Sequence, residues 1–248
     1  GFTTTVFADT LDGVLTSDTL SGLADNDTYF WRVRAIDDLG NLGTNSATRG
    51  FVTDTRAGQV VLSLPADGHE TTALKPVVSW TSLADSVGID SYIVEVSKSS
   101  GFTTTIFADT LDGVLTSDTL STLPDNDTYY WRVRAIDDLG NLGSNSATRG
   151  FIIDTTVAQV TLSLPADGHE TTVLKPVVSW TALADSVGID SYIIEASRTS
   201  GFTTTVFADT LDGVLTSDTL STLPDNDTYY WRVRAIDDLG NLGSNSTS

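Results

Sequence analysis

The chain has 248 residues, with 33 acidic against 13 basic side chains and a formal net charge of −20. This charge argues against nucleic acids and anionic bilayers as partners, because both would repel it. Cysteine is absent, so the fold depends on core packing without disulfides or thiolate metal sites. No apolar run approaches the roughly 20 residues that a membrane helix needs, and we expect no membrane insertion in this segment.

The sequence repeats with a period of 100 residues, since WRVRAIDDLGNLG begins at positions 31, 131 and 231. A period of this length corresponds to one small domain per repeat rather than to a solenoid unit. We expect 1–54 to be the C-terminal part of a repeat, 55–154 a complete repeat and 155–248 a repeat lacking its last strand. The chain is therefore expected to be a window on a longer array.

Each repeat is predicted to be all-β. Short runs rich in Val, Ile, Tyr, Trp and Thr alternate with turn residues, and no apolar period of 3.6 residues is sustained. In the complete repeat we predict seven strands, in chain order 59–64, 74–80, 91–97, 103–107, 115–120, 128–136 and 148–153. Short strands separated by frequent turns indicate an antiparallel β-sandwich.

The sixth predicted strand alternates between a core set and an outer set of side chains. The core set is Tyr129, Trp131, Val133 and Ala135, and the outer set is Tyr130, Arg132, Arg134 and Ile136. We expect the two arginines to lie beside Glu95 of the third strand. The alternative is that Tyr130 and Arg132 form a binding surface for a glycan or a protein.

These motifs resemble the fibronectin type III family. Trp80 occupies the core position of the second strand, and the sixth strand follows the family pattern from Tyr129 to Ala135. Leu123, six residues before Tyr129, matches the tyrosine corner of that family. The resemblance covers the entire period and implies tandem seven-stranded sandwiches, fibronectin type III or Ig-like, as in extracellular bacterial or archaeal adhesins and fibres. It implies almost nothing about chemistry.

The motif IDDLGN at the end of the sixth strand has two interpretations. One is a turn in which Asp and Asn bind the local backbone. The other is a calcium site, because in this fold the loops after the second and sixth strands meet the preceding linker, and calcium binds six to eight oxygens. The candidate ligands are Asp54, Asp85, Asp90, Asp137, Asp138 and Asn141. No other cofactor is expected.

The sequence also bears on glycosylation and on catalysis. N-x-Ser/Thr sequons make Asn26, Asn126, Asn226 and Asn245 candidates for glycosylation. Catalysis is not expected, because His69 and His169 are the same position in two repeats and no Cys or G-x-S-x-G motif accompanies them.

We therefore expect a non-catalytic structural array in an extracellular or cell-surface protein. It would serve as a spacer or stalk, or as the building block of a fibre or filament, with copies of itself as partners. The alternative is an accessory or glycan/protein-binding segment of a large secreted carbohydrate-active enzyme, whose catalytic domain lies outside this chain.

Overall fold

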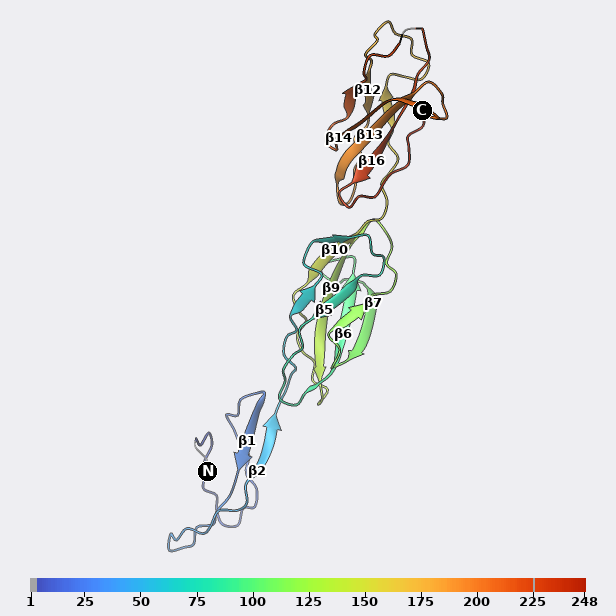
Figure 1. Cartoon of the computed structure of the whole chain (residues 1–248). Coiled ribbons are helices and arrows are strands. Elements are labelled where there is room, and N and C mark those ends of the chain that lie inside the picture. The colour runs from blue at the N-terminus through green and yellow to red at the C-terminus, as the bar shows by residue number, and fades with distance from the viewer. Residues whose placement is uncertain (1–3, 225) are drawn as a thin grey trace.

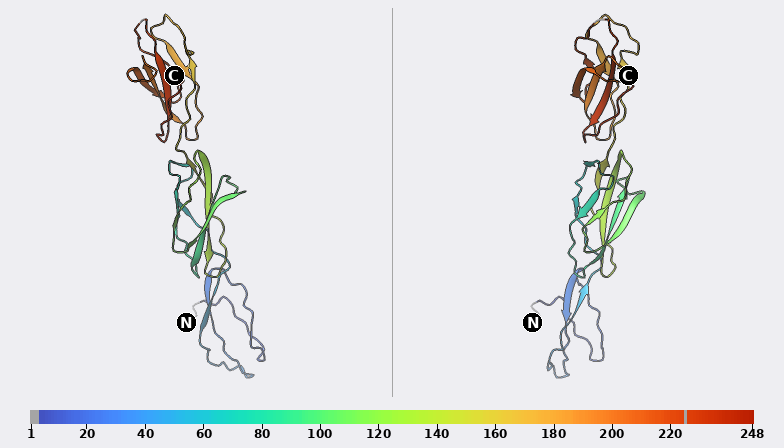
Figure 2. Two further views of the ribbon diagram at one scale, coloured as in Figure 1. Left: turned by 90° about the vertical axis from the view of Figure 1, so that its right-hand side faces the viewer. Right: turned by 45° about the vertical axis from the view of Figure 1, so that its right-hand side comes forward.

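The computed structural model describes residues 4–224 and 226–248, and its regular elements are all β-strands. Three units follow one another along the chain, and the views from different sides agree that they lie end to end (Figures 1 and 2). In the described part of the chain we find no helix of the length and apolarity that crossing a bilayer requires. The all-β fold class predicted from the sequence is confirmed.

The middle unit is a sandwich of a three-stranded and a five-stranded sheet. The first sheet has the order β3-β5-β8 and the second β4-β10-β9-β6-β7. The first consists of β3 (Leu62–Leu64), β5 (Val77–Trp80) and β8 (Ser117–Thr119). The second consists of β4 (His69–Thr71), β10 (Arg149–Ile153), β9 (Asp127–Asp137), β6 (Ile89–Ser97) and β7 (Thr105–Asp112).

The seven predicted strands all occur, in the predicted order, with different bounds. The strands of the small sheet are shorter than predicted, whereas β7 continues to Asp112. The short strand β4 was not predicted. It pairs in parallel with β10 over three residues, and so small a parallel ladder leaves no alternation in the sequence.

The core lies between the two sheets of the middle unit. Along β9 every second side chain, from Tyr129 to Ala135, is fully buried, which confirms the predicted alternation. Trp80 of β5 packs against Tyr92 of β6, with ring centroids 5.4 Å apart. The hydroxyl of Tyr129 donates to the carbonyl of Pro124 at 2.8 Å, and Leu123 is buried, as the tyrosine corner requires.

The last unit repeats this plan over the residues that the structure describes. One sheet contains β11 (Leu162–Leu164), β12 (Val177–Trp180) and β15 (Ser217–Thr219), and the other β13 (Ile189–Ser197), β14 (Thr205–Asp212) and β16 (Tyr230–Asp237). A second core, with Trp180 and Tyr192, lies between them. The first unit contains β1 (Asp27–Trp31) paired with β2 (Arg49–Thr53).

Candidate metal site at the domain junctions

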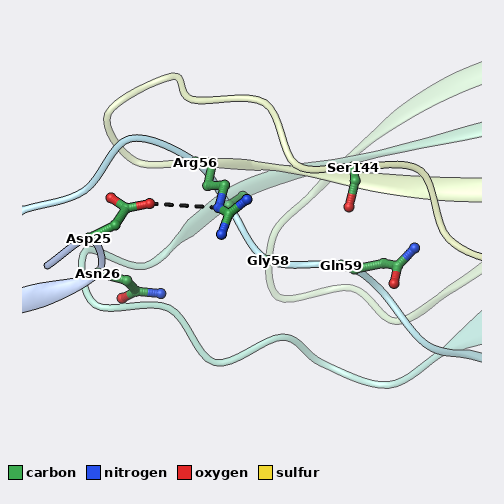
Figure 3. Close-up of a pocket in the computed structure, with 7 residues that line it drawn as sticks. Asp25, Asn26, Arg56, Gly58, Gln59 and Ser144 are labelled. Carbon is green, nitrogen blue, oxygen red and sulfur yellow. Dashed lines mark ion pairs between the residues drawn. The ribbon is translucent and has the colours of Figure 1, made fainter.

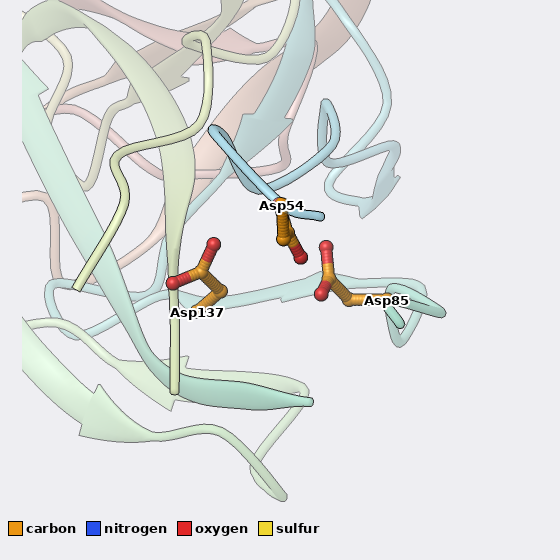
Figure 4. Close-up of side chains that lie close together, drawn as sticks. All are labelled: Asp54, Asp85 and Asp137. Atoms are coloured by element: carbon orange, nitrogen blue, oxygen red, sulfur yellow. The ribbon is translucent and has the colours of Figure 1, made fainter. Parts of the chain in front are cut away.

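Three aspartates from separate segments meet where the first unit joins the middle sandwich. Asp54 belongs to the linker after β2, Asp85 to the loop after β5, and Asp137 ends β9. One carboxylate oxygen of each lies within 4.8 Å of those of the other two. Figure 4 shows the three side chains converging. The sequence predicted that these loops and the linker would meet, and the structure brings these three candidates together.

Local hydrogen bonds hold Asp137 in this position. One of its carboxylate oxygens accepts from the backbone amides of Leu139 at 2.9 Å and Asn141 at 2.8 Å. Gly140 completes the turn with φ of +82°, a left-handed conformation that side chains disfavour. The turn interpretation of IDDLGN therefore describes the backbone, and the same turn aims Asp137 at the junction.

Asp85 is the least well paired of the three carboxylates. Its Oδ1 accepts from the amide of Val87 at 3.1 Å. Its Oδ2 is buried, with no hydrogen-bond partner among the described residues. Burial raises the pKa of Asp85 above its usual 3.8, and the nearby charges of Asp54 and Asp137 raise it further. The site thus favours a proton or a cation on Asp85.

The second junction repeats this arrangement one period later. Asp154, Asp185 and Asp237 also bring one carboxylate oxygen each within 4.8 Å of the others. Asp154 is fully buried, and its Oδ2 accepts from the hydroxyl of Ser186 at 2.5 Å. Burial again raises the pKa of Asp185, with Asp154 and Asp237 contributing. These three residues follow from the sequence, because each lies one 100-residue period after a member of the first group.

The other three calcium candidates do not belong to the group formed by Asp54, Asp85 and Asp137. Asn141 adjoins the group, and its side-chain amide donates to the carbonyl of Asp54 at 3.2 Å and to Asp137 Oδ2 at 2.8 Å. Asp90 is exposed and lies outside the group of three. Asp138 also lies outside it, and its amide donates to the carbonyl of Gly88 at 3.2 Å.

Two junction residues were not singled out from the sequence. Ser86 donates its hydroxyl to Asp54 Oδ2 at 3.2 Å, and its amide donates to Asn26 Oδ1 at 3.1 Å. At the second junction, the Ser186 hydroxyl that bonds Asp154 also lies within hydrogen-bond distance of Asn126 Oδ1, at 2.7 Å. A serine in an exposed loop carries no motif, so only the fold reveals that it links three segments.

The arrangement offers the kinds of ligand that a hard cation prefers. Three carboxylates and nearby backbone carbonyls are the ligand types that calcium prefers. Like charges this close repel each other when they are buried, and a divalent cation would relieve that repulsion. The residues present therefore fit calcium better than a softer metal, because no thiolate or imidazole belongs to either group.

The sequons lie beside the junctions or at the edge of the last unit. Asn26 and Asn126 are exposed and have positive φ, and both side-chain oxygens accept bonds across a junction. Asn226 also has positive φ, in the matching turn of the last unit. Asn245 is half-buried, and its backbone carbonyl accepts from Gln159 at 2.5 Å. Glycosylation of these residues stays a prediction.

In the proposed Tyr130 and Arg132 surface, the side chain of Arg132 is engaged within the domain. Arg132 Nε donates to Glu95 Oε2 at 2.8 Å, which is the cross-strand pair predicted from the sequence. The guanidinium also stacks over Phe102, 4.0 Å from the ring centroid. An arginine held by both contacts is positioned to stabilise the outer face of the sheet rather than to meet a ligand.

A hollow of about 380 Å³ lies beside the first junction (Figure 3). It is lined by Asp25, Asn26, Arg56, Gly58, Gln59 and Ser144, among others. An ion pair of 3.6 Å joins Arg56 to Asp25 across it. The residue one period after Arg56 is Thr156, so the second junction lacks this pair. We assign the hollow to the packing of this one junction.

Comparison with known proteins gives distant relatives, and no family model matches the chain. Chitinase A1 of Niallia circulans is 27% identical over 194 residues, which cover 75% of this chain and 25% of that protein. Endoglucanase B of Cellulomonas fimi is 28% identical over 235 residues, covering 92% and 22%. Exoglucanase B of Cellulomonas fimi is 29% identical over 246 residues, covering 94% and 21%. The chain thus spans about a quarter of the length of these relatives.

Among solved structures, the FN1-FN3 domains of chicken CNTN1 align with 90% of this chain and 75% of that chain, at 19% identity and a TM-score of 0.37. The fold itself is defined by the strand order, by Trp80 in the core and by the tyrosine corner of Tyr129. These features bear out the resemblance found in the sequence, and the chain is a tandem array of fibronectin type III-like sandwich domains.

Proposed function

We propose that this chain is a non-catalytic spacer within an extracellular protein. The observation that carries the proposal is the end-to-end course of the chain, which enters the middle sandwich at one end and leaves it at the other (Figure 1). We take 1–54, 55–154 and 155–248 as the units. Domains joined in this way set a distance between whatever lies on either side of them.

Short, hydrogen-bonded linkers support a spacer that keeps its length. Thr55 donates its amide to Asp25 Oδ1 at 2.8 Å, and Thr155 makes the same bond to Asp125 at 2.7 Å. The net charge of −20 favours an extended array, since its domains repel one another. The same features suit a stalk on a cell surface, or a fibre in which copies of the chain are the partners.

The named relatives support a second candidate within the same class. All three carry the names of enzymes that act on polysaccharides, and the matched region is a minor part of each. The chain would then be the accessory segment of a secreted carbohydrate-active enzyme, separating a catalytic domain from another module. Binding of the purified chain to insoluble chitin or cellulose, lost in a Tyr130→Ala, Arg132→Ala double variant, would favour a binding segment over a spacer.

The spacer proposal can be tested by changing the number of repeats. Deletion of residues 55–154 joins Asp54 to Thr155 and keeps the linker sequence of a natural junction. Small-angle X-ray scattering should show a maximum dimension shorter by one domain, with the remaining domain still folded. The control replaces 55–154 by a Gly/Ser segment of equal length, which behaves as a flexible coil and should broaden the distance distribution. A parent chain as compact as the deletion variant would refute the spacer.

We also propose that the two aspartate groups bind calcium and stiffen the junctions. The buried, unpartnered Oδ2 of Asp85 is the observation that favours it. Isothermal titration of calcium into the EDTA-treated chain should detect two sites, one at each junction. Asp85→Asn and Asp185→Asn should each remove one site, and Asp90→Asn should remove neither. Absence of binding heat, together with a melting temperature that calcium leaves unchanged, would refute the site.

A further inference from the structure

We infer that the outer face of the small sheet is a docking surface for a second copy of this chain, through which arrays associate side by side. This step rests on the fibre form of the proposed function, in which copies of the chain are the partners. In the middle unit the surface consists of five outward residues of β3, β5 and β8, and we call it the neutral face: Leu64, Val77, Ser79, Ser117 and Thr119. None of them belongs to a candidate site described above.

Strand pairing places two large apolar side chains on this face. Val78 of β5 is fully buried in the core, so its neighbour Val77 points outward. Leu64 of β3 lies opposite Ser79, the next outward position along β5. Leu64 is 64% exposed and Val77 is 56% exposed. The outward positions of β8 that pair with β5 carry only hydroxyl groups, those of Ser117 and Thr119.

The neutral face differs from the rest of a strongly acidic chain. None of its residues is ionisable, although the chain has a net charge of −20. The one acid of these strands, Asp118, pairs with the buried Val78 and so points into the sandwich. The outer face of the larger sheet, in contrast, carries Glu95, Arg132 and Arg134. Outward positions of a solvated sheet are usually polar, so an uncharged face with exposed Leu and Val indicates a contact surface.

The last unit repeats the neutral face one period later. Leu164 is 63% exposed and Val177 is 57% exposed, close to the values of their counterparts in the middle unit. The outward neighbours again carry hydroxyl groups, those of Ser179, Ser217 and Thr219. The array therefore presents the same surface once in every 100 residues.

Charge favours a second copy as the occupant. Two chains that each carry −20 repel each other over most of their surface, and contact through an uncharged face buries no unpaired charge. The centres of protein interfaces are likewise depleted of charged residues. Lys75, just before β5 at the end of the face, is exposed and forms no ion pair with a described residue. A second acidic copy supplies carboxylates for this lysine.

The size of the face explains why the occupant should share the repeat. Strands of three or four residues, about 4.8 Å apart, cover on the order of 200 Å². A stable interface buries roughly 800 Å² on each partner, so one pair of domains gives only a weak contact. A copy with the same 100-residue period adds a contact for each further repeat that meets its counterpart, and linked contacts strengthen one another. A partner without that period has no such gain.

Sedimentation velocity of the full chain tests the surface. The parent chain should associate as its concentration rises, and more strongly in about 1 M NaCl, where the screening length is about 3 Å. Val77→Glu combined with Val177→Glu puts a charge on each neutral face and should raise the dissociation constant on the order of tenfold or more. The matched control is Val114→Glu with Val214→Glu, which adds the same charge in turns that are 84% and 83% exposed. The control should change the dissociation constant by less than about threefold.

Cross-linking locates the contact directly. The chain has no cysteine, so Val77→Cys combined with Val177→Cys introduces its only thiols. Under mild oxidation this variant should form disulfide-linked dimers faster than Val114→Cys with Val214→Cys, although the turn positions are more exposed. Peptide mapping of the joined thiols gives the relative direction of the two arrays. Cross-linking rates that simply follow exposure would have the opposite order and would overturn the surface.

The remaining outcomes separate this surface from the proposed function. A chain that stays monomeric at both salt concentrations overturns the surface and the fibre form together, and leaves the spacer to the scattering measurement. Association that the glutamate substitutions leave unchanged keeps the fibre and removes this surface. A monomeric chain that binds insoluble chitin, and loses that binding with Val77→Glu and Val177→Glu, assigns the face to a polysaccharide instead. If that variant fails to fold, Leu64→Glu with Leu164→Glu replaces it with the same expected results.

Discussion

The side-chain amide of Asn141 donates to the backbone carbonyl of Asp54 at 3.2 Å, and so joins the last turn of the middle domain to the linker that precedes that domain. One period later, Asn241 makes the same bond to Asp154 at 3.1 Å. The same amide of Asn141 also holds Asp137. A turn residue thus couples the folding of the domain to the orientation of the junction.

Replacing Asn141 should weaken the middle domain. Asn141→Ala removes a partner from the Asp137 carboxylate, which is only 1% exposed and cannot turn to water. We expect the free energy of unfolding to fall by about 1–3 kcal/mol, measured by urea denaturation. Asn41→Ala is the matched control, because its partner Asp37 is exposed to water in the first unit. Equal losses in both variants would contradict the proposed role of burial.

Stability should be greatest in mild acid. Burial raises the pKa values of Asp85 and Asp185, so each charged form destabilises the fold at neutral pH. That loss is relieved as the pH falls through the raised pKa values towards 3.8. Hydrogen bonds from Thr55 lower the pKa of Asp25, so the charged form of Asp25 stabilises the fold. That stabilisation is lost only as the pH falls below 3.8. Urea denaturation from pH 7 to pH 3 should show the highest free energy of unfolding in mild acid, where Asp85 and Asp185 are protonated and Asp25 is still charged.

Two variants assign this pH dependence to the junctions. Asp85→Asn combined with Asp185→Asn should flatten the rise in stability between neutral and mildly acidic pH. Saturating calcium should also remove the rise, since a bound cation replaces the proton. The exposed Asp90→Asn should leave the profile unchanged. A profile that keeps its acid maximum in the double variant would assign the effect to other groups, such as Asp118, whose pKa burial also raises.

Sequence patterns predicted the fold well because the signals are strong and local. The alternation along β9 fixes which side chains face the core, and the spacing of Leu123 and Tyr129 fixes one corner of the sandwich. Strand bounds were less accurate, since β3 is only three residues long and its pairing with β5 shifts register between Leu62 and Leu64, which composition does not encode. The parallel strand β4 gave no pattern.

The junction site was predicted in part for a related reason. Asp54, Asp85 and Asp137 were found because the fold resemblance predicted which loops would meet. Choosing among neighbouring acids was not possible, because Asp137 and Asp138 are adjacent and only the strand register decides which one points inward. The contribution of Ser86 depends on the exact approach of two units, which no local pattern specifies.

The tyrosine corner should contribute measurably to stability. Tyr129→Phe removes the hydroxyl that donates to the carbonyl of Pro124 at 2.8 Å, while the fully buried ring keeps its packing. We expect a loss of about 0.5–1.5 kcal/mol in urea denaturation, the usual net value of one hydrogen bond. Tyr130→Phe, on the outer face of the same strand, should change stability by less. A larger loss of stability in Tyr130→Phe than in Tyr129→Phe would contradict the stabilising role of the Tyr129 hydroxyl.

The repeat offers an internal test of close backbone packing at the turn after β7. A Cβ at Gly113 would lie 1.8 Å from the carbonyl oxygen of Ile89, a backbone atom that cannot rotate away. Gly113→Ala should therefore lower the free energy of unfolding by more than about 3 kcal/mol, the upper end for overpacked sites. The equivalent Gly13 has no atom within 4 Å of its Cβ position, so Gly13→Ala should cost almost nothing. Because the surrounding sequence is the same, the backbone propensities of glycine and alanine cannot explain a difference in stability between the two variants. Equal melting temperatures for Gly113→Ala and Gly13→Ala would contradict the close approach of Gly113 to the carbonyl oxygen of Ile89.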